Sequence, residues 1–470
     1  MKIFSLKIDS RIASIGILIL SLFLAMVAIA LHSPGQISMD TSVQLYEAHI
    51  GESINWHPPF MSALMKWLGG GEVATAFIVL ICSSLTYLSL GCVAASILRN
   101  RTILGYPRIE AWRIVLCALL LLNPVLFIYV GIVWKDVLFA SVMTAAIALS
   151  FAAAFMPSRR AMALALVAVV LLTISMQVRQ QGVFMAPVLL ILPIIAIIGS
   201  RNWSVKRQAL IAGVVIGVFL VSLSITQFLV DQSIIKSGDR SRSQGYKSIM
   251  CFDIAGTIVG THTKTEDLPV KITNAQRAAV RLVFTGRRVD DLVSDPLELN
   301  VLTDKQLKQA WLSLILNEPK AYFEHKFRAF SELLDLNGLE GHAPLHIGVE
   351  GNSDYLRAVG IAESIDSRDH FIYSIASLFF GWPIYRNYFY LLSLLGCILA
   401  ITKVVHLPAR LKSMCWVLSL ATGLFYLSFL PTMISSDFRY LFSGITLCTI
   451  LWIVLLTASL PVNKNSKLLK

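Results

Sequence analysis

Charged residues are scarce in this chain. Of its 470 residues, 14% are charged and 56% are hydrophobic, and the mean hydropathy is +0.71. About a quarter of the residues of a soluble domain are charged, so this chain has too few charges to solvate a globular surface. We therefore exclude soluble domains, outer-membrane barrels, disordered chains and secreted disulfide scaffolds, and we expect an integral membrane protein.

Cysteine is also infrequent. Six of the seven cysteines fall inside long apolar stretches, and Cys251 alone lies outside them. One thiol outside the membrane cannot form an intrachain disulfide there. The cysteine spacing also shows no metal-binding pair.

Apolar runs of about 20 residues, separated by short basic clusters, make up most of the chain. A run of that length can cross a hydrocarbon core of roughly 30 Å as a helix. The sequence therefore predicts an all-α, polytopic membrane protein with about ten transmembrane helices. The expected spans are residues 12–32, 73–98, 114–131, 137–156, 161–177, 183–199, 209–230, 384–402, 413–432 and 441–460.

The net charge of +12 comes from basic residues expected on one side of the membrane and does not indicate a nucleic-acid-binding surface. With the N-terminus inside, the expected cytoplasmic segments hold 18 basic residues and two acids. The long outer segment from Asp231 to His370 holds 17 basic residues and 20 acids. Lys and Arg favour the cytoplasmic side, so the asymmetry predicts that both termini are cytoplasmic. No nucleic acid is expected as a partner.

The first apolar stretch is expected to be an uncleaved helix. Residues Met1 to Arg11 precede 21 apolar residues, whereas the apolar region of a signal peptide has roughly 7–15. No small-residue cleavage site precedes the polar residues that begin at His32.

The expected spans divide the chain into three parts. Residues 1–230 form a membrane domain of seven spans, with a first outer loop at 33–71 that holds candidate catalytic residues. Residues 231–370 form a large outer subdomain, and residues 371–470 form a C-terminal membrane domain of three spans. Loops as long as the middle part are usually functional or form a small domain.

The large outer subdomain shows helical patterning. Thr303 and Asp304 form a start signal for a helix through Leu316, and Asn317-Glu318-Pro319 resembles a cap with proline in the first turn of the next helix. An apolar stripe on that second helix is expected to pack onto the membrane domain or to lie at the lipid interface. The stripe consists of Phe323, Phe327, Phe330 and Leu334.

Polar residues near the ends of the spans gather on the outer side. Ionisable groups at membrane depth cost about 2.5–3.5 kcal/mol each on insertion scales, which favours a functional site. The guanidinium of arginine can hold two phosphate oxygens, and a carboxylate can act as general base toward a hydroxyl. The combination predicts transfer from a lipid phosphate. The residues concerned are Asp40, Gln44, Trp56, His57, Lys135, Asp136, Arg179, Asp437, Arg439 and Tyr440.

These residues resemble, in their order, the polytopic GT-C glycosyltransferases of bacterial membranes. The resemblance extends over most of the chain, and the segment 231–370 matches in placement and in fragments. It implies a multi-span enzyme that transfers a sugar from a polyprenyl-phosphate-linked donor to an envelope glycan or lipid acceptor at the outer face of the bacterial cytoplasmic membrane. The motifs are Asp40-x-x-x-Gln44, Trp56-His57-Pro58-Pro59, Trp134-Lys135-Asp136, the turn at Arg179, and Asp437-x-Arg439-Tyr440.

The resemblance also implies residue roles. In that family an acid of the first outer loop acts as base, and this role falls on Asp40. The family often has two adjacent acids or a second acid in the next outer loop; residue 41 is Thr here, which leaves Asp136 as the counterpart. Such enzymes invert the anomeric centre with one base, and cations stabilise the leaving phosphate. The implied substrate-binding residues are Gln44, Trp56, His57, Lys135, Arg179, Arg439 and Tyr440.

The sequence leaves a divalent cation open as a cofactor and indicates no other. Carboxylate oxygens are suitable ligands for such an ion. Asp40 and Asp136 can share one only if the fold brings their side chains together.

The candidate residues of the first outer loop also have structural interpretations. Asp40 can cap a helix that starts at Thr41, a role that aspartate favours. His57 precedes two prolines, which fix its direction, and can make a structural hydrogen bond. Glu47 and Glu52 are expected to be solvated loop charges.

The candidate cations have alternatives as well. Arg179 can extend from its span to the membrane interface, as long basic side chains do. Arg439 can form a structural pair with Asp437. Lys135 and Asp136 are sequence neighbours that face different ways on a helix, so a local ion pair between them is not expected.

Two rival functions stay open. An O-antigen polymerase or ligase also has many spans and a large outer loop, but it would use polyprenyl diphosphate substrates and usually arginine-rich outer loops, whereas this long loop is net negative by three charges. A transporter or flippase would show inverted repeats and broken helices at the bilayer midplane, and the sequence shows neither.

Overall fold

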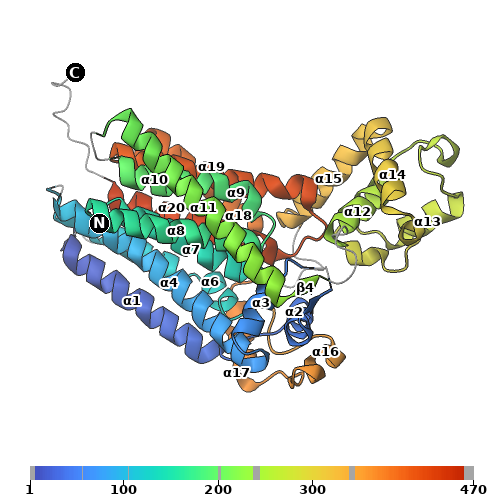
Figure 1. Cartoon of the computed structure of the whole chain (residues 1–470), viewed down its shortest axis with the longest axis horizontal. Coiled ribbons are helices and arrows are strands. Elements are labelled where there is room, and N and C mark those ends of the chain that lie inside the picture. The colour runs from blue at the N-terminus through green and yellow to red at the C-terminus, as the bar shows by residue number, and fades with distance from the viewer. Residues whose placement is uncertain are drawn as a thin grey trace.

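The computed structural model describes residues 6–54, 57–103, 105–199, 203–236, 244–337 and 344–459. The chain forms a bundle of long helices, with a smaller group of helices projecting from one end of it (Figure 1). The expectation of an all-helical, polytopic membrane protein is confirmed.

Nine helices in the described residues are long and apolar enough to cross a membrane. Nine of the ten expected spans coincide with them. They are α1 (Ser10–His32), α4 (Gly71–Ile103), α5 with α6 (Ala111–Leu121 and Pro124–Tyr129), α7 (Lys135–Ala153), α8 (Ser158–Val178), α11 (Val205–Ser233), α18 (Asn387–Leu399, continued to Val404), α19 (Ala409–Thr432) and α20 (Phe442–Ala458).

The tenth expected span, 183–199, is a shorter apolar segment, Gly182–Ile198. It consists of two helices, α9 (Gly182–Leu189) and α10 (Ile191–Ile198), which meet at Leu190. Pro193 has no N–H to donate to the carbonyl of Leu189, so the hydrogen-bond ladder is interrupted at this point.

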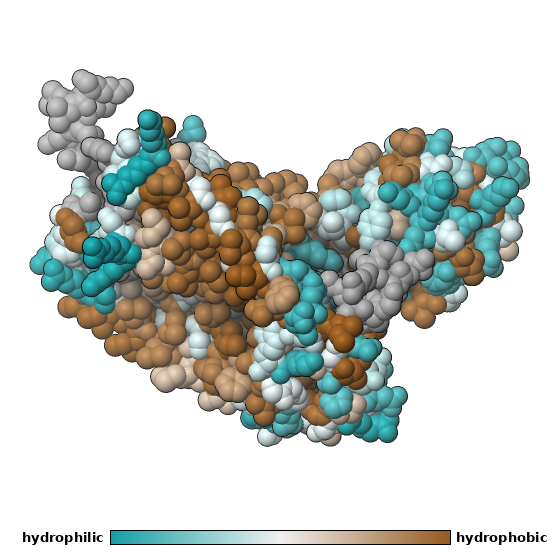
Figure 2. Space-filling view, in the orientation of Figure 1, coloured by the Kyte–Doolittle hydropathy of each residue, from teal (hydrophilic) through white to brown (hydrophobic). Residues whose placement is uncertain are grey.

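Two membrane helices form the centre of the bundle. The apolar windows of α7 and α20 are 94% buried, whereas that of α11 is 17% buried and faces outward. Small residues permit close helix contacts; a Cβ on Gly91 of α4 would lie 2.3 Å from Ser21 Oγ of α1. On the face seen in Figure 2, hydrophobic side chains cover most of the bundle, as contact with a bilayer requires.

The long outer segment folds as two parts. Residues 244–337 form a helical unit of α12 (Gln244–Gly260), α13 (Asn274–Val283), α14 (Asp304–Asn317) and α15 (Pro319–Leu333), which has its own hydrophobic core. Residues 344–377 return to the bundle, where α16 (Ser353–Ala358) packs on α2 (Met39–Ile50) and α17 (Ser367–Ser377) packs on α6.

The helix signals in the outer segment are confirmed. Thr303 caps α14 in a reciprocal capping box with Gln306, and Pro319 begins α15. The apolar stripe is divided. Phe330 and Leu334 pack against the membrane core, whereas Phe323 and Phe327 are exposed.

Short β contacts join distant segments. Strand β1 (Lys7–Asp9) pairs with β3 (Arg108–Glu110), and β2 (Glu52–Ser53) pairs in parallel with β4 (Ile235–Lys236). An isolated antiparallel β-bridge between Arg288 and Ser435 joins the helical unit to the segment before the last span. The remaining regular helix, α3 (Phe60–Trp67), follows β2.

The helix directions agree with the expected sidedness. The ends of α2, α7, α8 and α19 that carry the candidate residues meet at one end of the bundle, here called the outer end. Arg101 donates to the carbonyls of Thr457 and Ser459 at the opposite, inner end.

Cysteine labelling tests which side each end faces. Exposed residues Asp354 and Lys305, replaced by Cys, should react with a membrane-impermeant maleimide added to intact cells. Cys at Arg159 or Lys206 should react only after permeabilisation, because the basic clusters are expected inside. The wild-type chain controls for its seven native cysteines, and labelling of Lys206→Cys in intact cells would contradict the orientation.

Candidate active site

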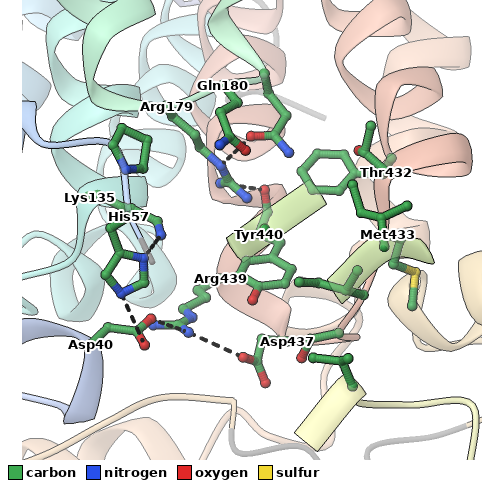
Figure 3. A pocket seen from close by; sticks show the side chains of 18 of the residues that line it. Asp40, His57, Lys135, Arg179, Gln180, Thr432, Met433, Asp437, Arg439 and Tyr440 are labelled. Carbon is green, nitrogen blue, oxygen red and sulfur yellow. Dashed lines mark hydrogen bonds and ion pairs between the residues drawn. The ribbon is translucent and has the colours of Figure 1, made fainter. Parts of the chain in front are cut away.

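A cavity of about 670 Å³ lies at the outer end of the bundle. The bundle, the first outer loop and the helical unit all contribute to its wall, and its charged side chains point into it (Figure 3). Asp290, from the helical unit, stands at its exposed rim. The candidate residues that line it are Asp40, His57, Lys135, Arg179, Asp437, Arg439 and Tyr440.

The start of α2 is docked onto the turn before α7. Thr41 Oγ1 donates to the carbonyl of Val133 (2.7 Å), and Trp134 Nε1 donates to Ser38 Oγ (2.7 Å). These bonds bring Asp40 of α2 and Lys135 of α7 to the same cavity.

Asp40 is not the cap of its helix. Ser38 is the N-cap, so Asp40 lies in the first turn and its carboxylate is free to face the cavity. Its Oδ2 lies 2.6 Å from Arg439 Nη2, its Oδ1 lies 3.6 Å from His57 Nε2, and its side chain is 24% exposed. Burial raises the pKa of Asp40, but Arg439, His57 and Lys135 outweigh burial, so the pKa lies well below its usual range.

His57 bridges Lys135 and Asp40. Its Nδ1 lies 2.5 Å from Lys135 Nζ, and a protonated ammonium can only donate, so Nδ1 must accept. The neutral ring therefore carries its proton on Nε2, directed at Asp40. Burial and the charge of Lys135 lower the pKa of His57, which keeps the ring neutral at physiological pH.

Glu47 holds the segments on either side of His57. The expectation that Glu47 is a solvated loop charge was wrong. Its side chain is fully buried on α2. Its carboxylate accepts from the N–H of Ile54 (2.6 Å) and from Ser62 Oγ (2.6 Å), which lie on opposite sides of His57 in the chain. Glu47 is seven residues after Asp40, two turns along the same helix face. This spacing was the sequence signal that Glu47 lies on the same side of the helix as Asp40.

Asp136 forms a buried ion pair with Arg179. The two side chains are 1% and 5% exposed. Arg179 also donates to the carbonyl of Tyr440 (3.0 Å) and to Gln181 Oε1 (2.9 Å). Arg179 therefore joins the starts of α7 and α20 instead of extending to the membrane interface.

Arg439 lies in a 3₁₀ turn, Phe438–Leu441, that leads into α20. Its guanidinium stacks over the ring of Trp134, 4.7 Å from the centroid. The expected partner Asp437 is 3.4 Å from Arg439 but 2.9 Å from Arg288 of the helical unit. The charge of Asp437 is thus neutralised mainly by Arg288, and the charge of Arg439 is neutralised by Asp40.

Asn387 supports the same turn from behind and has no motif that reveals it. Fully buried at the start of α18, it donates from Nδ2 to the carbonyls of Leu333 (3.0 Å) and Phe438 (3.4 Å). Its N–H donates to Asp335 Oδ2 (2.8 Å). These bonds connect the end of α15 to the residue that precedes Arg439.

Among the described candidates, Gln44 and Asp136 do not line the cavity. Gln44 is 1% exposed on the buried face of α2. Trp56 lies outside the described residues.

The described residues contain no group of three or more His, Cys, Asp and Glu side chains that could hold a metal ion. Asp40 and Asp136 are each paired with a different arginine. Two carboxylates neutralised in this way are poor ligands, so the donor set does not fit the divalent cation that the sequence left open.

No family model matches this chain, and no curated protein matches it. Among solved structures it is similar to an archaeal oligosaccharyltransferase, AglB from Archaeoglobus fulgidus, in complex with an inhibitory peptide and a dolichol-phosphate. The similarity covers 93% of this chain and 50% of that one, at 14% identity and a TM-score of 0.39. This chain spans about half the length of that protein.

Lys135→Met should move the acid limb of the pH–rate profile to higher pH. Lys135 adds to burial in lowering the pKa of His57, so its removal raises that pKa. Protonated His57 pairs more strongly with Asp40 and makes that carboxylate a weaker base, so the rate falls at a higher pH, by about one unit for a close like charge. Rates measured from about pH 4 to 9 test this. Lys305→Met, exposed on the helical unit, serves as control, and an acid limb that does not move would contradict the bridge.

Proposed function

We propose that this protein is a GT-C-type glycosyltransferase. It transfers a sugar from a polyprenyl-phosphate-linked donor to a cell-envelope glycan or lipid acceptor at the outer face of the bacterial cytoplasmic membrane. The observation that carries the proposal is one carboxylate, Asp40, facing a cavity whose buried charges have a net excess of one cation.

The charge balance of the cavity supports a phosphodiester donor. In the buried part of the cavity, three cations, Lys135, Arg179 and Arg439, surround two carboxylates, Asp40 and Asp136. Nearer the rim, Asp437 is paired with Arg288, and Asp290 is exposed to solvent. The excess of one positive charge matches the single negative charge of a lipid-phosphate sugar. A diphosphate carries more negative charge, so the balance favours this donor over the substrate of a polymerase or ligase.

The membrane side of the cavity suits a lipid tail. Phe429 and Thr432 of α19 and Phe184 of α9 line this side, and Phe184 is 48% exposed. A donor held here would place its phosphate among the cations and its chain along apolar side chains that face the bilayer. The break between α9 and α10 leaves α9 as a short helix beside this opening.

The proposed reaction needs one base and a stabilised leaving group. Asp40 accepts the proton of the acceptor hydroxyl, whose oxygen forms a bond to the anomeric carbon. The bond from that carbon to the phosphate oxygen breaks, so the configuration inverts and the phosphate takes both bonding electrons. Because the low pKa of Asp40 makes it a weak base, stabilisation of the phosphate by Arg439 and Lys135 must supply much of the rate.

Asp40→Asn should lower the single-turnover transfer rate by roughly 10²- to 10⁴-fold, the usual contribution of a positioned base. The amide has nearly the same shape, its oxygen can still accept from Arg439, and α2 stays docked through Thr41 and Ser38, so expression and membrane insertion should be unchanged. The measurement uses purified protein with a polyprenyl-phosphate sugar and envelope acceptor material. Asp354→Asn, 81% exposed on the same side, is the matched control. Retention of more than half the wild-type rate would remove Asp40 from the base role.

Arg439→Lys should lower transfer by about 10- to 100-fold, because lysine keeps the charge but loses the paired N–H groups. Part of the loss should appear in turnover, since the phosphate gains charge as the sugar leaves. Arg357→Lys, at an exposed surface pair, should match the wild type. Wild-type transfer by both Arg439→Lys and Arg439→Ala would end the phosphate assignment.

A further inference from the structure

A second cavity, of about 940 Å³, lies in the side of the bundle and shares no residue with the candidate active site. Its floor is α20, and its walls are α5 and α18 with the segment that continues to Val405. All three helices are membrane spans, so the cavity faces the hydrocarbon region of the bilayer. Its size is near the upper end of the roughly 300–1,000 Å³ of ordinary ligand sites.

Two pairs of polar side chains in the wall of this cavity are bonded to each other. Trp452 Nε1 donates to Ser393 Oγ (2.7 Å), and Asn123 Nδ2 donates to the hydroxyl of Tyr390 (3.2 Å). The rest of the wall is mainly leucine, valine, isoleucine and aromatic side chains. The cavity therefore offers an apolar surface, which suits hydrocarbon chains rather than water or a polar solute.

The two ends of the cavity carry residues typical of a membrane interface. Trp382 lies at the outer end and Trp112 at the inner end, and tryptophan is enriched at both interfaces of a bilayer. The cavity thus extends along most of the depth of the membrane, as a lipid chain does.

The inner end of the cavity is basic. Arg113 and His406 line it, and the exposed Lys403 directly precedes the lining residue Val404. None of the described residues that line the cavity is acidic. Glu110 and Arg113 neutralise each other at 3.0 Å, so Lys403 supplies the remaining positive charge. A positive rim next to an apolar cavity complements an anionic headgroup with its chains inside the protein.

We propose that this cavity is a binding site for an anionic phospholipid of the inner leaflet. The acyl chains lie on α20 between α5 and α18, and the headgroup phosphate lies beside Lys403 and His406. The site is independent of the proposed catalytic function, because it depends on no residue of the catalytic cavity.

Fluorescence quenching tests occupancy by the chains. Purified protein in detergent is titrated with phosphatidylglycerol brominated on its acyl chains, and Trp452 emission is taken as the difference between wild type and Trp452→Phe. Saturable quenching of Trp452 is expected. Thr449→Phe, which fills the floor, should abolish it, whereas Leu220→Phe, on the exposed face of α11, should leave it unchanged. Equal quenching in wild type and Thr449→Phe would overturn the site.

A headgroup comparison tests the charge. Brominated phosphatidylglycerol should bind the 940 Å³ cavity more tightly than brominated phosphatidylcholine, as measured by quenching of Trp452. Lys403→Gln should reduce that preference about fivefold, which is the effect of one basic residue near an anionic lipid. Lys206→Gln, at the inner end of another helix, is the control. Equal affinity for both lipids would overturn the assignment of the cavity to an anionic phospholipid. If a co-purifying protein blocks the quenching, a helix of that protein occupies the cavity instead, and the proposal is wrong.

Discussion

The ion pair between Asp40 and Arg439 is the interaction on which the outer end of the molecule depends. Asp40 belongs to the first outer loop and Arg439 to the turn before the last span, so the pair connects segments about 400 residues apart in the chain. Charges taken out of water need close partners, and leaving one of them alone costs about 3–5 kcal/mol. The packing of α2 on the α7 turn, the stacking of Arg439 on Trp134 and the support from Asn387 all hold this pair in place.

The same requirement applies to three further acids. Asp136 is paired with Arg179, Asp437 with Arg288, and Asp253 of α12 with Lys326 of α15. Each pair joins two different elements, so neutralising the charge also fixes the relative position of helices. The cavity is therefore organised by the fold itself, and in the proposed function the remaining cation is available to the donor phosphate.

The features that depend on local sequence patterns are those that the sequence predicts. The spans, the capping box at Thr303 and the gathering of Asp40, His57, Lys135, Arg179 and Arg439 at one end follow from apolar run length, capping chemistry and loop charge. Local patterns do not predict which distant residue a buried side chain contacts. Nothing near Glu47 in the sequence shows that Ser62 and Ile54 will enclose it, and nothing near Asp136 names Arg179 as its partner. The break in span 183–199 could have been read from Pro187 and Pro193, which both lie inside it.

The turn that carries Arg439 also has a consequence for biosynthesis. It precedes the last helix, α20, which is one of the two central helices of the bundle. During synthesis the earlier spans enter the membrane while Asp40 has no arginine partner and the centre of the bundle lacks one of its members. The cavity can be completed only when α20 inserts, late in translation. A ribosome that stalls before that point leaves a membrane-inserted chain without an assembled site, so insertion of the last helix acts as the step that separates a nascent chain from a competent protein.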